Sequence, residues 1–168
     1  GGEVDYKLWG TNRFLDKKTK PPYAHSYMLT SILGADYVDV DGNGVTDNDL
    51  GYWVRFDYVK YADTAKWRAP YHGANYDRGA NGSQDDDIGS YVYGQKELWY
   101  VSKIETKTHV LVFELSERKD QLEAAGEFAN SGTGTKSGLK VDKISLYLKD
   151  EYQNVSADPV PLQEVHFE

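Results

Sequence analysis

The sequence predicts an all-β fold, a β-sandwich of jelly-roll type with long loops and at most one short helix. Three observations support this prediction. Short segments alternate apolar and polar side chains, glycine-rich turns separate them, and the 14 tyrosines favour strands. Short strands joined by such turns are typical of sandwiches and of closed barrels, so a barrel is the alternative architecture.

Length and charge limit both the architecture and the partners. A chain of 168 residues fits one domain with a substantial core, so we predict a single domain over residues 1–168. The net charge of -8 argues against a nucleic-acid partner, because phosphate binding requires a basic face. No apolar run reaches the length of a membrane span, so we expect no membrane insertion by this segment. The absence of cysteine excludes disulfides and thiolate metal sites.

The first part of the chain contains two predicted strands. Residues 23–33 are apolar and bounded by proline and glycine, which indicates a buried strand. Residues 51–61 show the clearest alternation, and their even-numbered side chains are expected to face the core. That register leaves Trp53, Arg55 and Asp57 on the opposite face.

The middle of the chain, residues 62–96, has no periodic apolar pattern and many glycines. We expect a long irregular segment there, which in a compact domain is usually functional or mobile. It contains Trp67, Tyr71 and Tyr76, more aromatic surface than a connector requires.

The second part of the chain returns to strand patterns. Apolar side chains of both parities indicate strands covered on both faces, and a run of helix formers after Ser116 indicates the short helix. The predicted elements are, in order, two strands within 97–116 that meet near 105–108, a short helix over 117–126, a loop over 128–138, and strands over 139–148 and 162–167.

An acidic loop, residues 39–49, directly precedes the clearest strand. Ca²⁺ takes about six to eight oxygen ligands, and alternate residues of a tight loop can supply them. The loop begins like an EF-hand, but Leu50 occupies the position of the bidentate glutamate and the flanks look extended. We therefore predict a shorter Ca²⁺ loop within a β-domain. The predicted ligands are Asp39, Asp41, Asn43, the carbonyl of Val45, Asp47 and Asp49. The alternative is a turn with solvated carboxylates, because Asp, Asn and Gly favour turns.

Two groups of aromatic residues are candidates for carbohydrate binding. Sugar rings stack on exposed aromatic faces, while charged side chains bond their hydroxyls. The first group is Trp53 with Arg55 and Asp57, and the second is Trp67, Tyr71 and Tyr76. The alternative is that both tryptophans pack inside the fold.

The sequence carries no catalytic motif that predicts an enzyme. It has no nucleophile elbow, and its four histidines lack zinc-ligand spacing. A glycoside hydrolase using a pair of strand carboxylates, from among Asp57, Glu97, Glu105 and Glu114, is a remote alternative. We predict no catalytic residues.

Several phrases occur in a fixed order from Tyr23 onward: YAHSYMLTSIL, DLGYWVRFDY, WRAPY, GSYVYGQKELWYVSKIETKTHVLVFELSERKD, KVDKISLY and VHFE. Together they resemble a segment of very long, predicted cell-surface proteins of Bacteroides-type bacteria. The resemblance implies one extracellular module, excised from a larger polypeptide, whose partners are neighbouring domains or other surface proteins. It implies no assigned activity. The sequence thus predicts a non-enzymatic structural or interaction module stabilised by Ca²⁺, with a carbohydrate-binding module as the alternative.

Overall fold

The computed structural model describes residues 18–69, 71, 91–127, 133–154 and 159–168. Its elements are β1 (Ser31–Leu33), β2 (Trp53–Ala69), β3 (Val92–Thr106), β4 (His109–Ala124), β5 (Thr133–Leu148), α1 (Lys149–Asn154) and β6 (Gln163–His166). The prediction of an all-β fold with one short helix is confirmed. Within the described residues, no helix is long and apolar enough to cross a membrane.

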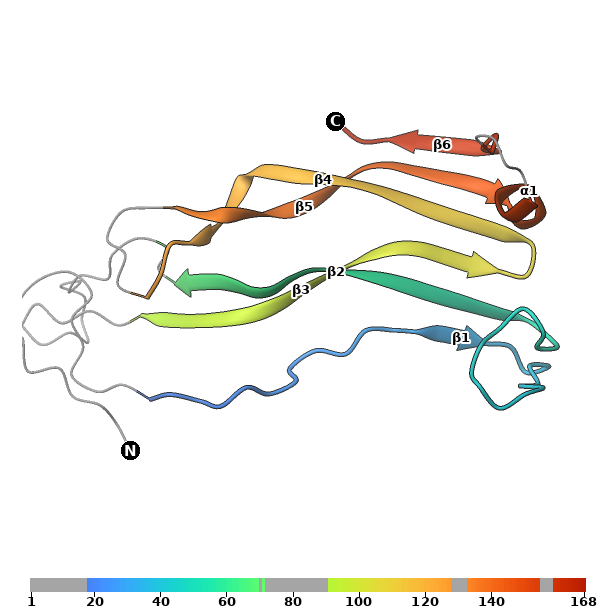
Figure 1. The fold of residues 1–168 in the computed structure, drawn as a ribbon, viewed down its shortest axis with the longest axis horizontal. Helices are drawn as coiled ribbons and strands as arrows, with labels where there is room; N and C mark the ends of the chain where they lie inside the picture. The colour runs from blue at the N-terminus through green and yellow to red at the C-terminus, as the bar shows by residue number, and fades with distance from the viewer. Residues whose placement is uncertain (1–17, 70, 72–90, 128–132, 155–158) are drawn as a thin grey trace, which may run out of the picture. The chain divides into compact units, whose positions relative to one another are not determined.

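The six strands form one sheet in sequential order, β1-β2-β3-β4-β5-β6 (Figure 1). The pairs β1/β2, β3/β4 and β5/β6 are antiparallel, with Leu33 opposite Trp53, Glu105 opposite Val110, and Ile144 opposite Val165. The sandwich is not confirmed, because the strands of the described residues belong to this single sheet.

The chain divides into two compact units. One consists of Gly1–His25, Ala62–Leu98 and Arg118–Gly138, and the other of Ser26–Tyr61, Trp99–Glu117 and Leu139–Glu168. We call them the first and the second unit. The single domain over residues 1–168 stays a prediction.

Each unit has its own buried side chains. In the first unit these include Ala62, Ala65 and Ala124, together with the polar Arg68 and Ser137.

The second unit buries Trp53 and Val110 together with Asp49, Glu105, Ser145 and Lys149. Oppositely charged residues therefore lie in its interior beside a tryptophan. This combination requires ion pairing, because an unpaired buried charge is strongly unfavourable.

Two strand predictions need correction. Residues 23–33 do not form a buried strand: β1 covers only Ser31–Leu33, and Ile32 and Leu33 are about half exposed at 48% and 49%. β1 stands at one end of the strand order, which explains the exposure. The irregular segment predicted over 62–96 is also wrong at both of its ends, because β2 continues to Ala69 and β3 begins at Val92, and residues 70 and 72–90 lie outside the described part of the chain.

The helix predicted over 117–126 is wrong, because β4 continues as a strand to Ala124. Tertiary bonds outweigh the local helix propensity here. Glu117 accepts a hydrogen bond from the Tyr61 hydroxyl, and the Glu123 carboxylate accepts one from the backbone amide of Lys66. The short helix is α1 instead.

The loop predicted over 128–138 is replaced by β5 from Thr133 onward, and residues 128–132 lie outside the described part of the chain. The strands predicted within 97–116 and over 139–148 and 162–167 are confirmed by β3, β4, β5 and β6.

The predicted register of residues 51–61 is also wrong. Trp53 is 0% exposed, whereas Tyr52 is 56% exposed. Trp53 lies in the interior of the second unit, where the Nζ of Lys149 is 4.9 Å from its ring centroid, whereas the even-numbered side chains of Val54, Phe56 and Tyr58 are only partly buried.

Candidate functional site

The acidic loop is built on turns that require glycine. Gly42 and Gly44 have φ angles of 71° and 92°, in the left-handed region that other residues rarely adopt. These turns direct backbone amides onto Asp39, whose Oδ1 accepts a bond of 2.6 Å from Gly42 and whose Oδ2 accepts one of 3.1 Å from Gly44.

Asp49 anchors the other end of the loop from the interior, where it is 1% exposed. Its Oδ1 accepts a hydrogen bond from the Val40 amide at 3.0 Å. Its Oδ2 accepts bonds from the Thr46 amide at 2.8 Å and the Tyr37 hydroxyl at 3.0 Å. The buried Asp49 carboxylate therefore holds the loop together through these three hydrogen bonds.

The pKa values of Asp49 and Tyr37 reflect the same contacts. The hydrogen bond from the Thr46 amide is the largest influence that lowers the pKa of Asp49. Burial, followed by the hydrogen bond to the Asp49 carboxylate, raises the pKa of Tyr37 to about 12. Asp49 is thus ionised and Tyr37 protonated at neutral pH.

Three carboxylates of the loop converge. Asp39, Asp41 and Asp49 each present an oxygen, and these oxygens lie within 4.8 Å of one another. A carboxylate oxygen has two lone pairs, so one that accepts an amide hydrogen can still bind a cation. The arrangement suits a hard divalent ion such as Ca²⁺, which prefers oxygen ligands.

Of the three other predicted ligands, the carboxylate of Asp47 is not part of this group. Asn43 is exposed. The carbonyl of Val45 accepts a hydrogen bond of 3.1 Å from Arg55 Nη1. Asp47 contacts Lys149 Nζ through Oδ1 and lies within 3.5 Å of Gln153 Nε2 through Oδ2.

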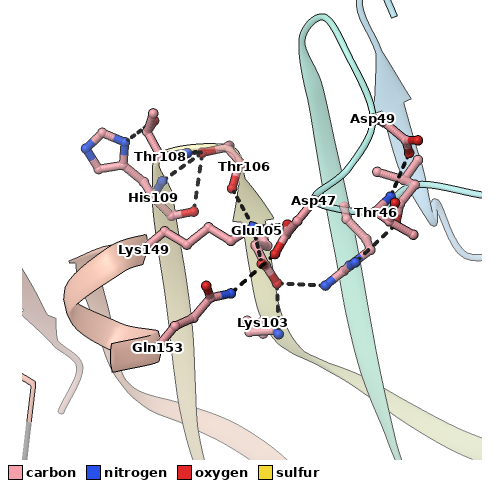
Figure 2. Close-up of polar contacts among 12 residues, drawn as sticks. Thr46, Asp47, Asp49, Lys103, Glu105, Thr106, Thr108, His109, Lys149 and Gln153 are labelled. Carbon is pink, nitrogen blue, oxygen red and sulfur yellow. Dashed lines mark hydrogen bonds and ion pairs between the residues drawn. The ribbon is translucent and has the colours of Figure 1, made fainter. Parts of the chain in front are cut away.

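A second polar cluster surrounds Glu105, which is 2% exposed (Figure 2). Its Oε1 lies 2.6 Å from Lys149 Nζ. Its Oε2 lies 2.8 Å from Arg55 Nη2 and 2.9 Å from Lys103 Nζ. One buried carboxylate thus holds three cations from β2, β3 and the start of α1. We call these four residues the Glu105 centre.

The Glu105 centre fixes the ionisation of its carboxylate. Burial by itself raises the pKa of Glu105, but the hydrogen bonds from Lys149 and Lys103 and the charge of Arg55 outweigh it and lower the pKa to about 2. Glu105 is therefore ionised at all physiological pH values.

The first aromatic surface predicted for carbohydrate is closed. Trp53 is 0% exposed and cannot stack on a sugar. Arg55 belongs to the Glu105 centre, and Asp57 Oδ2 lies 3.1 Å from Lys103 Nζ of the same centre. Trp53 instead packs inside the fold, as the alternative interpretation of the sequence predicted.

The second aromatic surface is open in part. Trp67 is 40% exposed, and with Tyr71 it lines a pocket of about 210 Å³ in the first unit. Tyr71 is tied down by its hydroxyl, which donates to the Glu123 carbonyl at 2.9 Å. Tyr76 lies outside the described residues.

Sequence reasoning missed the Glu105 centre. In the sequence Glu105 is only one of several carboxylates on predicted strands. Lys149 directly follows a predicted strand and belongs to no recognisable motif. Asp47 and Lys149 are 102 residues apart, and no local spacing predicts such a pairing.

Comparison with known proteins adds no relative: no family model, no curated protein and no solved structure matches this chain.

Proposed function

We propose that this chain is a non-enzymatic structural or interaction module of a large exported surface protein, and that Ca²⁺ stabilises it. One observation supports the metal above all: the carboxylates of Asp39, Asp41 and Asp49 converge within 4.8 Å in a loop that precedes β2.

The position of the loop explains how an ion would stabilise the module. The Val38–Leu50 bridge closes the loop, through amide–carbonyl bonds of 3.1 and 3.0 Å. Converging carboxylates repel one another, and a cation between them removes this repulsion. Bound Ca²⁺ therefore stabilises the folded loop relative to the unfolded chain.

The two outer strands of the sheet support an interaction role. β1 and β6 are the outer strands of the described sheet, and outer strands present unpaired backbone groups to a partner. Apolar side chains stand exposed beside both. Near β1 these are Tyr27, Met28, Leu29, Ile32 and Leu33, and near β6 they are Val160, Leu162, Val165 and Phe167.

The alternatives have less support. Carbohydrate binding loses the Trp53 surface and keeps the pocket beside Trp67 and Tyr71. A glycosidase that uses Glu105 is disfavoured, because this carboxylate is 2% exposed and paired with three cations.

Calorimetric titration tests the metal proposal. Ca²⁺ added to the metal-free chain is expected to give a saturable binding heat, and the Asp39→Ala/Asp41→Ala double variant is expected to lose it. Asp49 is left intact because it holds the fold. The melting temperature should be higher in Ca²⁺ than in chelator. By mass action, Ca²⁺ at a hundredfold excess over Kd should raise the unfolding free energy by about 2.7 kcal/mol.

The matched control is Asp120→Ala, which removes a carboxylate that pairs with Arg118 outside the loop. It should bind Ca²⁺ like the original chain. Absence of binding heat together with equal melting in Ca²⁺ and chelator would reject the metal and leave the loop as a solvated turn.

A further inference from the structure

Three groups with complementary chemistry meet at the edge of the Glu105 centre. Lys149 Nζ contacts Asp47 Oδ1 and lies 2.6 Å from Glu105 Oε1. An amine thus touches the carboxyl group of one acidic residue while a second carboxylate touches the same nitrogen (Figure 2).

The amine is held in one place by the surrounding structure. The Lys149 amide donates to the Thr108 carbonyl at 2.9 Å, which fixes the backbone at the start of α1. The side chain is 6% exposed, and its Nζ lies 4.9 Å from the centroid of the buried Trp53 ring and 3.4 Å from the Thr106 carbonyl. Bulk water therefore has little access to the nitrogen.

We propose that Lys149 and Asp47 form an intramolecular isopeptide bond, with Glu105 as the catalytic residue that transfers the protons. Asp47 lies in the acidic loop but outside the converging carboxylates of Asp39, Asp41 and Asp49, so this inference does not depend on a bound metal.

The step balances without any co-reactant. Glu105 accepts a proton from the Lys149 ammonium group, and the nitrogen lone pair attacks Asp47 Cγ to form an N–C bond. A second proton leaves the nitrogen, and both protons depart with one Asp47 oxygen as water when its C–O bond breaks. The product is a neutral secondary amide, and Glu105 returns to its ionised form.

Two physical effects drive the reaction. The fold holds amine and carboxyl in contact, and in well-aligned cases such placement corresponds to effective molarities of about 10⁵–10⁸ M. The amide also replaces a buried ammonium and its counter-ion by one neutral group, which removes the desolvation cost of the ion pair. The reaction needs to occur only once in each chain, so even a slow reaction is sufficient.

The structure also provides a route for the released water. A pocket of about 260 Å³ lies beside the reacting groups, lined by Asp47, Lys107, Lys149, Asp150 and Gln153. Asp47 is 52% exposed, so its departing oxygen can pass into solvent.

Lys103 provides an internal comparison. It also contacts Glu105, at 2.9 Å, and an aspartate, Asp57, at 3.1 Å. Its side chain is 29% exposed, however, against 6% for Lys149. Water solvates the Lys103 pair and stabilises it as ions, so Lys103 is expected to remain a free amine.

Intact-mass spectrometry of the denatured 168-residue chain tests the proposal. The chain is expected to be lighter than its sequence mass by one water molecule. Protease digestion should yield one branched peptide that joins the segments containing Asp47 and Lys149. The Lys149→Arg, Asp47→Ala and Glu105→Gln variants are each expected to show their full sequence masses.

Two further variants keep the test independent of folding defects. Lys140→Arg, which changes a lysine that pairs with Asp142 outside the Glu105 centre, should still lose one water. Asp47→Asn should lose one ammonia, because the side-chain amide nitrogen is then the leaving group. A full sequence mass for the unaltered chain, a branched peptide that joins other residues, or a loss of water from Lys149→Arg or Asp47→Asn would overturn the assignment.

Discussion

Glu105 shows how one buried carboxylate organises the second unit. Lys149, Lys103 and Arg55 come from segments far apart in the sequence and meet at its two oxygens. An isolated carboxylate in this position would be strongly unfavourable, and its three partners make it acceptable. Removing the charge therefore leaves the buried Lys149 and the partly buried Lys103 and Arg55 without their counter-ion.

The Glu105 carboxylate predicts a particular pH dependence. Its pKa falls from an ordinary value of 4.5 to about 2 in the folded chain. The stabilisation is therefore complete above the unfolded pKa and is lost as the pH falls from about 4.5 towards 2, a contribution on the order of 3 kcal/mol at neutral pH. Arg55 and Lys103 preserve this direction when Lys149 is an amide.

The measurement compares denaturant unfolding of two chains that cannot form the cross-link, Lys149→Arg and the double variant Lys149→Arg/Glu105→Gln, at neutral pH and at about pH 3. The double variant should be less stable than Lys149→Arg at neutral pH, and the difference should shrink in acid. A difference that is equally large at both pH values would contradict this role of the charge.

Residue-scale chemistry could be predicted from the sequence only where the partners are close together. The spacing of Asp39 and Asp41 predicted their convergence, and Asp49 joins them within the same loop. Asp47 was assigned to the same group but turns to Lys149, because the loop alone does not determine what packs against its outer side.

The acidic loop is the element whose backbone is most constrained. Gly51, where the loop meets β2, has a φ of 76°, and a Cβ added there would overlap the Asp36 carbonyl group. Gly42 has a similar φ of 71°, but a Cβ added there would have no neighbour within 4 Å. A side chain at Gly42 would therefore meet only the strain of the left-handed φ, whereas one at Gly51 would also collide with the backbone of Asp36.

Alanine substitutions at these glycines should differ in cost. Gly42→Ala is expected to lower the unfolding free energy by about 1 kcal/mol, from the left-handed φ alone. Gly51→Ala should lower it by about 3 kcal/mol or more, because the backbone must also move. Denaturant unfolding of the two variants checks this, and equal losses would contradict the close approach of the Asp36 carbonyl to Gly51.

Strands could be predicted where the apolar pattern was clear and the pairing partner followed directly in the sequence, as for β3 and β4 on either side of residues 107–108. The pattern failed over 117–124, where local helix propensity points one way and strand pairing the other. It also failed at Trp53, because alternation defines two faces but does not say which one is buried.

At the scale of the whole molecule, a cross-link between residues 47 and 149 would serve a chain that contains no cysteine. It closes a loop of 102 residues. By analogy with a disulfide of that span, it would remove unfolded-state entropy worth about 4–5 kcal/mol.

Stretching single molecules by their two ends tests the cross-linked module most directly. The fully extended chain is expected to be shorter than the extended Lys149→Arg variant by the 102 residues inside the loop, roughly 350 Å. The comparison does not require the variant to fold, because only extended lengths are compared. Equal extended lengths would show that residues 47 and 149 are not joined.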